Sequence, residues 1–244
     1  MKSISVFFPA YNDERSIPIL VENTIKTLSP ITKDYEIIII DDCSPDNVGR
    51  IADEIVKKNK KIKVIHHEKN RGYGGALRSG FKAATKDLVF YTDGDGQYDV
   101  KEITKLLKYI DDPNIDIVNG YKIKRSDNII RKILGKAYYN SVKVLFNIKI
   151  NDVDCDFRLF KRKVIDSINL ISNSGGITIE LVKKSQQKGF KFKEVPVNHY
   201  PRLEGKSQFF RPSIILKTFK ELGKLWFDIM ILRKWKNFLR IKVY

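Results

Sequence analysis

Cysteine and histidine are scarce in this sequence of 244 residues. Its two cysteines, Cys43 and Cys155, cannot build the disulfide framework of a small secreted domain, and they lack the spacing of a zinc site. The three histidines, His66, His67 and His199, are not spaced as a metal cluster either. We therefore expect a protein of a reducing compartment, and we expect it in the cytoplasm.

Long apolar runs are also missing. None approaches the roughly 18 residues of a transmembrane helix, and the chain begins directly with a predicted strand rather than with a signal peptide. Glycines at residues 72–75 precede a predicted helix, but Leu77 stands where a third glycine would complete G-x-G-x-x-G, and the P-loop spacing is absent. We expect no membrane-spanning helix, and neither a dinucleotide-binding motif nor a P-loop.

Acidic residues are outnumbered: 29 Asp and Glu stand against 46 Lys and Arg, a formal net charge of +17. Residues 202–244 contain 11 of the basic residues and only 3 of the acidic ones. Such an excess indicates nucleic acid, an anionic membrane surface or a phosphorylated substrate as partner. A general bias of composition toward lysine and isoleucine would also account for it.

Strand and helix patterns alternate through residue 120. Strands are predicted at residues 3–8, 35–40, 62–65, 88–92 and 115–120, with helices at about 16–28, around 51–56, 76–84 and 100–109. The four consecutive isoleucines at 37–40 predict a strand buried on both faces, as in a parallel sheet. The alternation predicts an α/β fold with a doubly wound, mostly parallel sheet flanked by helices.

Carboxylates follow two of these predicted strands. Asp93 and Asp95 come directly after residues 88–92, and residues two apart in an extended chain point to the same side. Ligands of open α/β sheets bind beyond the carboxyl ends of the strands, and two carboxylates suit Mg²⁺ or Mn²⁺ together with substrate phosphates. A simple Asp-Gly turn is the alternative. A second acidic strand end, Asp41-Asp42, favours the ligand site.

The second half of the chain is more irregular. Aspartates alternate along residues 151–160 and could supply a base or bind cations, or they could be solvated loop residues. A helix is predicted at 176–187 and an edge strand at 190–197, and the basic, glycine-containing loop 199–207 suits a diphosphate.

Two amphipathic segments are also predicted. The helix over residues 129–146 follows a basic loop, and its apolar face more often packs on a sheet than lies at an acceptor entrance. From Pro212 onward, apolar residues alternate with lysines, and Trp226, Phe227 and Trp235 lie among the bases. This pattern favours a helix at a membrane interface. Docking on the domain, or on a second copy of the chain in a homo-oligomer, is the alternative.

Six short motifs follow one another along the chain. They are Pro9-Ala10-Tyr11-Asn12 with Glu14, Asp41-Asp42, Asn70-Arg71-Gly72, Asp93-Gly94-Asp95-Gly96-Gln97, Asp156-Phe157-Arg158-Leu159-Phe160, and Arg202-x-x-Gly205-x-Ser207. In this order, over about residues 3–210, the chain resembles the family 2 glycosyltransferases of the GT-A fold. Within them it is most similar to the dolichyl- and polyprenyl-phosphate sugar transferases.

The resemblance implies three groups of site residues. Those for the donor, a GDP- or UDP-sugar, are Pro9, Tyr11, Glu14 and Asp42 at the nucleoside, with Asp93, Gln97, Arg202 and Ser207 at the diphosphate. Those for the metal, Mg²⁺ or Mn²⁺, are Asp93, Asp95 and Gln97. Those on the acceptor side are Arg125, Arg131, Asp154 and Arg158, with Asp156 and Arg158 joining Asp93 and Asp95 as catalytic residues. Lys122 stands where family members often carry arginine.

The resemblance implies a metal-dependent, inverting transfer of a sugar to a polyprenyl phosphate at the cytoplasmic face of a membrane. Residues 1–211 would form the catalytic domain and residues 212–244 a basic tail on an anionic membrane surface. An ionised lipid phosphate needs no strong base, whereas a saccharide or other soluble acceptor, the alternative, would need Asp154 or Asp156 as one. Nucleic acid would explain the charge but not the acidic strand ends, so we expect no nucleic-acid partner.

Overall fold

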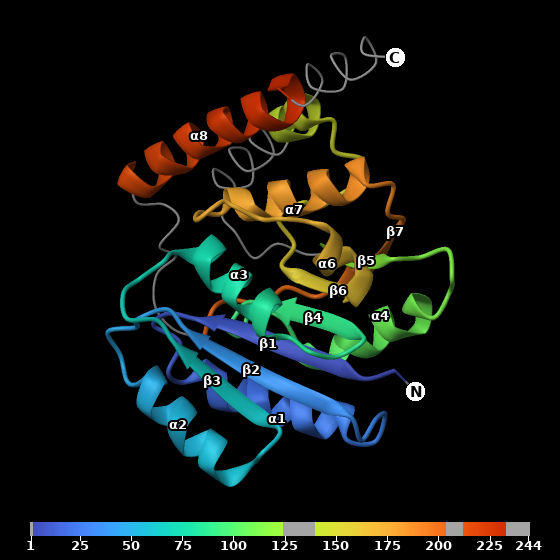
Figure 1. Ribbon diagram of the computed structural model, residues 1–244. Coiled ribbons are helices and arrows are strands. Elements are labelled where there is room, and N and C mark those ends of the chain that lie inside the picture. The colour runs from blue at the N-terminus through green and yellow to red at the C-terminus, as the bar shows by residue number, and fades with distance from the viewer. Residues whose placement is uncertain (1, 124–139, 204–211, 233–244) are drawn as a thin grey trace.

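The structure is a computed structural model that describes residues 2–123, 140–203 and 212–232. One seven-stranded sheet, ordered β3-β2-β1-β4-β6-β5-β7, has helices on both faces (Figure 1). The strands are β1 (Ile4–Ala10), β2 (Tyr35–Asp41), β3 (Ile62–His66), β4 (Leu88–Thr92), β5 (Ile117–Lys122), β6 (Phe157–Lys161) and β7 (Phe192–Val197). Within this described sheet β6 alone runs antiparallel to its neighbours, which confirms the predicted mostly parallel sheet.

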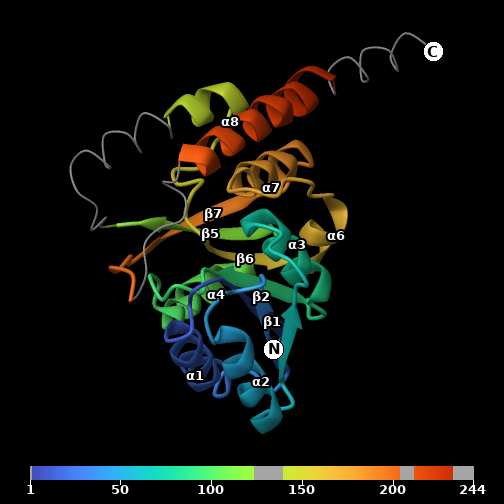
Figure 2. The same cartoon turned by 90° about the vertical axis from the view of Figure 1, so that its left-hand side faces the viewer.

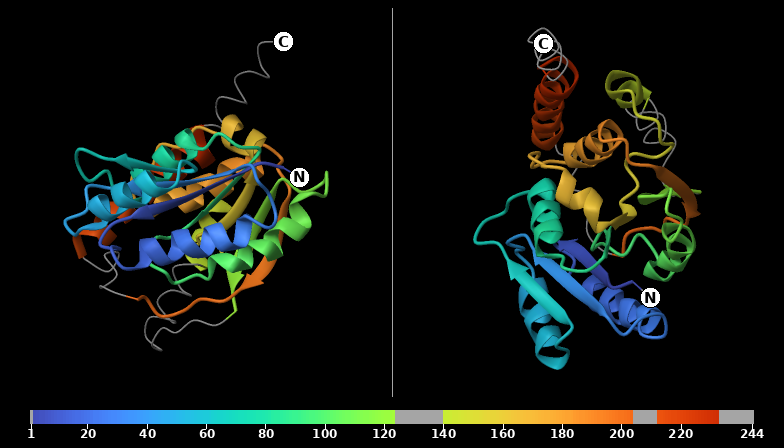
Figure 3. Two further views of the ribbon diagram at one scale, coloured as in Figure 1. Left: turned by 90° about the horizontal axis from the view of Figure 1, so that it is seen from below. Right: turned by 45° about the vertical axis from the view of Figure 1, so that its right-hand side comes forward.

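Helices cover the two faces of the sheet in separate groups. One face packs against α1 (Ser16–Leu28), α2 (Val48–Lys58) and α4 (Ile103–Ile110), the last preceded by a 3₁₀ turn, η1 (Val100–Glu102). The other face packs against α3 (Tyr73–Ala83), α6 (Arg162–Ser167) and α7 (Gly176–Gln187). Figure 3 (left) looks onto the face that α1 and α4 cover.

The isoleucines of β2 show why the sheet is buried on both sides. Ile37 and Ile39 pack with α1 in one core cluster, whereas Ile38 and Ile40 pack with α3 in the other. All four side chains are completely buried. The strand buried on both faces, predicted from the four consecutive isoleucines, is confirmed.

The topology brings many chain segments to one edge of the sheet. The parallel strands β1, β2, β3, β4, β5 and β7 all end there. Because β6 runs in the opposite direction, it begins at the same edge. Residues that follow the parallel strands and residues that precede β6 are therefore neighbours in space.

A third layer lies outside α7. α8 (Pro212–Trp226) continues into a π-helical turn, η3 (Phe227–Leu232), and both views in Figures 1 and 2 show α8 above α7. Leu222 and Leu225 of α8 are buried with Ile179 and Val182 of α7. Residues 140–146 are helical and join this layer, while the rest of the helix predicted over 129–146 lies outside the described residues.

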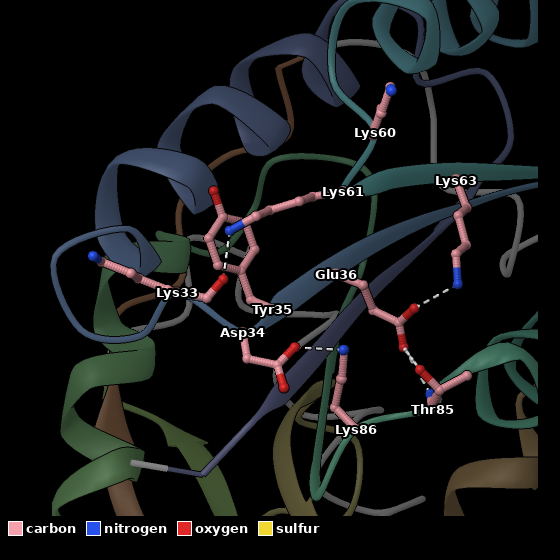
Figure 4. A pocket seen from close by; sticks show the side chains of 9 residues that line it. All are labelled: Lys33, Asp34, Tyr35, Glu36, Lys60, Lys61, Lys63, Thr85 and Lys86. Carbon is pink, nitrogen blue, oxygen red and sulfur yellow. Dashed lines mark hydrogen bonds and ion pairs between the residues drawn. The ribbon is translucent and has the colours of Figure 1, made fainter.

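A shallow pocket of about 260 Å³ opens at the opposite edge, near the amino ends of β2 and β3 (Figure 4). It is lined by Lys33, Asp34, Tyr35, Glu36, Lys60, Lys61, Lys63, Thr85 and Lys86. Lys86 pairs with Asp34, and Lys63 lies 2.8 Å from Glu36. The buried Glu36 carboxylate also accepts hydrogen bonds from both the amide and the hydroxyl of Thr85, each at 2.7 Å. Ion pairs within the pocket thus neutralise part of its positive charge.

Candidate active site

Three carboxylates lie along the edge where the parallel strands end, with Asp93 and Asp156 close together. Asp42 follows β2, Asp93 follows β4 and Asp156 precedes β6. Thr92 of β4 lies opposite Phe157 of β6 in the sheet, so Asp93 and Asp156 flank the same point. The structure therefore brings together aspartates that are far apart in the sequence.

Burial and neighbouring charges act on both Asp93 and Asp156. Asp93 Oδ1 accepts a 2.7 Å hydrogen bond from the Tyr73 hydroxyl. Burial, followed by the charges of Asp156 and Asp95, raises the pKa of Asp93 well above its ordinary value. Asp156 accepts a 3.0 Å hydrogen bond from the Tyr91 hydroxyl, and burial raises its pKa as well. Negative charge is thus concentrated where a cation would relieve the repulsion.

Arg202 already provides one positive charge at this point. Its Nη2 donates to Asp95 Oδ2 at 2.7 Å, and its Nη1 lies 4.0 Å from Asp13 Oδ1. Two hydrogen bonds hold the segment that carries Arg202. The Tyr200 amide donates to the Gln97 carbonyl at 2.8 Å, and Gln97 Nε2 donates to the Tyr200 carbonyl at 3.0 Å. Asp95, Gln97 and Arg202, predicted from separate motifs, lie together.

Asp93 and Asp95 suit the donor set of a Mg²⁺ or Mn²⁺ site that has two protein carboxylates. No group of three or more His, Cys, Asp or Glu side chains that could hold a metal occurs among residues 2–123, 140–203 and 212–232. A cation here would take its remaining ligands from substrate phosphates and water, as Mg²⁺ commonly does. The loop is also tight, because a Cβ on Gly94 would overlap the carbonyl oxygen of Pro9.

The residues predicted at the nucleoside lie around the ends of β1 and β2. Pro9 is within β1, and Tyr11 follows that strand directly and is half-buried. Glu14 Oε2 accepts hydrogen bonds from the amide and the side chain of Asn47, at 2.8 and 3.0 Å. Asp42 is 4% exposed.

Arg158 lies beneath the site rather than at its surface. It is completely buried, and its guanidinium donates to Asn119, to the Val153 carbonyl and, at 3.1 Å, to the Tyr91 hydroxyl. Since Tyr91 in turn donates to Asp156, Arg158 is linked to Asp156 through the Tyr91 hydroxyl. A direct contact between Arg158 and an acceptor stays a prediction.

Asp154 lies beside Asp156 in the loop before β6. Burial raises the pKa of Asp154 to about 6, although the charge of Lys122 opposes the shift. Lys122 donates to the Asp154 carbonyl at 2.7 Å and lies 3.5 Å from the Asp152 carboxylate. Lys122, where the resemblance leads one to expect an arginine, is therefore tied to this loop.

Three predicted site residues, Arg125, Arg131 and Ser207, lie outside the described residues. Their assignments to the acceptor and the diphosphate stay predictions.

Two site residues escaped the sequence analysis. Tyr73 directly follows the Asn70-Arg71-Gly72 motif, and this position next to a motif is the sequence feature that could have indicated it. Asp13 lies inside the motif that begins at Pro9; its Oδ2 accepts a 2.9 Å hydrogen bond from the Tyr11 amide. Burial, with a smaller contribution from the charge of Asp95, raises the pKa of Asp13 to about 7.

A family model shows which protein family this chain belongs to. Residues 5–168 match the model described as Glycosyl transferase family 2. The chain belongs to this family. The glycosyltransferase activity predicted from the six motifs is thereby confirmed at the level of the family.

Curated relatives of this family 2 glycosyltransferase include two Pectobacterium proteins, each named undecaprenyl-phosphate 4-deoxy-4-formamido-L-arabinose transferase. The protein from P. carotovorum subsp. carotovorum (strain PC1) is 28% identical over 231 residues, which cover 94% of this chain and 67% of the relative. The protein from P. atrosepticum (strain SCRI 1043 / ATCC BAA-672) is 30% identical over 69% of this chain. The family 2 glycosyltransferase spans only 51% of the length of that second relative.

Solved structures share the fold of this family 2 glycosyltransferase. A mannosyltransferase from Pyrobaculum calidifontis, crystallised with GDP-Man and Mn²⁺, has a TM-score of 0.66 and 17% identity over 91% of this chain and 64% of its own. Glucosyl-3-phosphoglycerate synthase from Mycobacterium tuberculosis, crystallised with UDP, has a TM-score of 0.67 and 17% identity over 92% of this chain and 80% of its own. These likenesses confirm the predicted GT-A fold.

Proposed function

We propose that this family 2 glycosyltransferase transfers a sugar from a GDP- or UDP-sugar to a polyprenyl phosphate. The observation that carries the proposal is the gathering of Asp93, Asp95 and Asp156 at the edge of the sheet where the buried Asp42 also lies. The names of the curated relatives support polyprenyl phosphate as the acceptor class.

In this proposal Asp93 and Asp95 hold a Mg²⁺ or Mn²⁺ ion, with Gln97 in the same loop. When bound, such an ion supplies Lewis-acid stabilisation of the leaving nucleoside diphosphate. Tyr73 orients Asp93 by its hydrogen bond, and Arg202 beside Asp95 offers a guanidinium to the diphosphate oxygens.

The nucleoside of the donor would lie along Pro9, Tyr11, Glu14 and Asp42, at the ends of β1 and β2. Asp42 is suited to this role because it is fixed by a 2.7 Å hydrogen bond from the Arg71 amide. A carboxylate oxygen offers only acceptor positions, so it selects a nucleoside group that donates.

The acceptor would approach the anomeric carbon from the Asp156 side, opposite the leaving diphosphate, and the transfer would invert that carbon. A lipid phosphate is already ionised at neutral pH, so its oxygen attacks without a strong general base. Arg125 and Arg131 are proposed to bind that phosphate. Asp156, held by Tyr91 and supported by Arg158, would help to position the reacting groups.

An exposed apolar surface suits attachment to the anionic cytoplasmic face of a membrane. No helix in the described ranges is long and apolar enough to cross a bilayer. Exposed apolar side chains occur on α8, η3 and residues 140–146, and Trp226 Nε1 of α8 donates to the Leu145 carbonyl at 2.9 Å. These exposed side chains are Val144, Leu145, Leu216, Phe219 and Phe227. Exposed Lys220 and Lys224 also lie on α8, so we propose that the tail, residues 212–244, lies on an anionic surface.

A soluble saccharide acceptor is the second candidate. The observation in its favour is Asp154, whose pKa is raised to about 6 by burial and which lies beside Asp156. A carboxyl group with such a pKa suits general-base catalysis on a sugar hydroxyl.

The test combines donor and acceptor screens. Nucleotide sugars are incubated with Mg²⁺ or Mn²⁺ and either a short polyprenyl phosphate or the matching polyprenol, which keeps the apolar contacts but lacks the phosphate. We expect transfer to the phosphate only, and loss of most turnover in Asp95→Asn. Equal transfer to the alcohol or to a free sugar would refute the lipid-phosphate acceptor. Full turnover of Asp95→Asn would refute the metal assignment.

A further inference from the structure

Two consecutive histidines pair with two consecutive aspartates across β2 and β3. Asp41 lies opposite His66 in the sheet, with 2.8 Å between His66 Nδ1 and Asp41 Oδ2. The next pair is shorter, with 2.6 Å between His67 Nδ1 and Asp42 Oδ1. Neighbouring residues of a strand point to opposite faces, so the two pairs lie on opposite faces of the sheet. The outer pair is completed by Asp53 of α2, 3.3 Å from His66 Nε2.

The inner pair is almost completely enclosed. The side chain of His67 is 3% exposed and that of Asp42 is 5% exposed, whereas the His66 side chain is 44% exposed. The other ring nitrogen of His67, Nε2, lies 2.8 Å from the hydroxyl of Ser79 on α3. His67 therefore connects the end of β2 to a helix on the covering layer.

The hydrogen bonds of Asp42 show how His67 orients its carboxylate. Asp42 Oδ1 accepts from the Arg71 amide at 2.7 Å and faces His67 Nδ1, which must carry a proton to donate to a carboxylate. Nε2 of the same ring forms a hydrogen bond with the Ser79 hydroxyl. Oδ1 has two donors, while Oδ2 of Asp42 has no partner among the described residues. His67 and Arg71 thus hold Oδ1 of Asp42 and leave Oδ2 available to accept a hydrogen bond from a ligand.

The helix that anchors His67 also supports the diphosphate side of the site. Tyr73, in the first turn of α3, donates to Asp93, and Ser79 lies further along the same helix. One rigid element therefore holds Asp42 through His67 and Asp93 through Tyr73. The positions of the nucleoside carboxylate and the diphosphate carboxylate are set relative to each other.

We propose that His67 is a positioning residue for the nucleoside half of the donor. It holds the Asp42 carboxylate in the orientation in which Oδ2 accepts a hydrogen bond from the nucleoside. This inference rests on the proposed function, because it assigns Asp42 to a nucleotide donor. A histidine with a purely structural role would affect stability, or both halves of the donor site alike, without separating nucleoside from diphosphate.

A matched pair of substitutions distinguishes the hydrogen bond made by Nδ1 of His67 from the one made by Nε2. The amide nitrogen of His67→Asn reaches the place of Nδ1 and can still donate to Asp42, whereas that of His67→Gln reaches the place of Nε2 and cannot. We measure binding of UDP, GDP and inorganic pyrophosphate by calorimetry, each with Mn²⁺. His66→Gln, at the outer pair, is the control.

For the better-binding nucleotide, we expect His67→Gln to lose at least about tenfold in affinity, the usual effect of one hydrogen bond to a charged group. His67→Asn should stay within a few-fold of the parent, as should His66→Gln, and pyrophosphate binding should be unchanged in all of them. In turnover, His67→Gln should raise the donor KM and leave kcat nearly unchanged. Ser79→Ala, which keeps the ring, should show a smaller loss of nucleotide affinity if His67→Gln fails to fold.

Equal losses in His67→Asn and His67→Gln would overturn the positioning role, as would a parallel loss of pyrophosphate binding. Unchanged nucleotide affinity in His67→Gln, or in Ser79→Ala if only that variant folds, would also overturn it. If the parent protein binds neither UDP nor GDP, the proposed function itself fails, and the His67 assignment fails with it.

Discussion

Glu36 is expected to be a major stabilising residue although it lies far from the candidate active site. Glu36 is 4% exposed, and its carboxylate joins three segments. Ser5 of β1 donates to it at 2.6 Å. The other two are drawn in Figure 4: Thr85 donates twice at 2.7 Å, and Lys63 of β3 lies at 2.8 Å. These partners outweigh the effect of burial and lower the pKa of Glu36 from 4.5 to about 2. Glu36→Gln keeps the shape but removes the charge and turns an NH₂ group toward one of the donors.

The magnitude follows from that pKa. The fall from 4.5 to about 2 corresponds to about 3 kcal/mol at neutral pH. We reduce this to about 2 kcal/mol because Lys63 is half exposed to screening solvent. Since folding lowers the pKa, the stabilisation is complete above pH 4.5 and declines as the pH falls toward 2. The stability gap between parent and Glu36→Gln should therefore be largest at pH 7 and should narrow between pH 5 and 3.

Urea unfolding at several pH values measures this gap. Glu54→Gln is the matched control, because Glu54 pairs with Arg50 at 2.8 Å on the exposed surface of α2. Such exposed pairs contribute only about 0.3–0.5 kcal/mol. If Glu36→Gln is no more destabilising than Glu54→Gln at pH 7, or if its gap is the same at pH 7 and pH 3, the reasoning about Glu36 is wrong.

Four further outcomes are expected. Gly80→Ala should lower the free energy of unfolding by about 1–3 kcal/mol in urea, because its Cβ would overlap an aromatic ring of β1. Gly223→Ala, whose Cβ meets nothing within 4 Å, should instead stabilise α8 by up to about 1 kcal/mol. Asp154→Asn should retain substantial turnover with polyprenyl phosphate in a steady-state assay, and loss of that turnover would favour the soluble acceptor. Phe219→Glu should reduce flotation with anionic liposomes, whereas Ile19→Glu on the distant helix α1 should not; equal flotation of both would contradict membrane attachment through α8.

Regular, strongly patterned segments were predicted well from the sequence. The predicted bounds 16–28 and 176–187 agree with α1 and α7, because an unbroken apolar periodicity ends at clear boundaries. β6 was not predicted as a strand, since its residues Phe157–Lys161 mix aromatic and basic side chains. That mixture is explained by the fold: Arg158 points into the interior, where Asn119 and Tyr91 bind its guanidinium.

The candidate site, too, was predicted from the sequence only in part. The acidic strand ends could be predicted because the topology of an open α/β sheet decides where they meet. The partners of those carboxylates could not be predicted, because they depend on contacts between distant segments. His67 and Tyr73 illustrate this, since each bonds an aspartate 20 or more residues away. The histidines looked uninformative as a metal cluster, and their pairing with Asp41 and Asp42 requires the register of β2 with β3.

The reversed direction of β6 has a consequence for how this enzyme can diversify. β5 ends and β6 begins at the same edge, on adjacent strands, so the chain between Lys122 and Phe157 leaves the sheet and returns to almost the same place. Outside its contacts with α7, α8 and the strands, such an excursion can change in length and sequence without shifting β5 or β6. In the proposed function the acceptor side lies in this segment, so transplanting it between relatives should exchange acceptor preference, while the donor residues on β1 to β4 and Arg202 after β7 remain as they are.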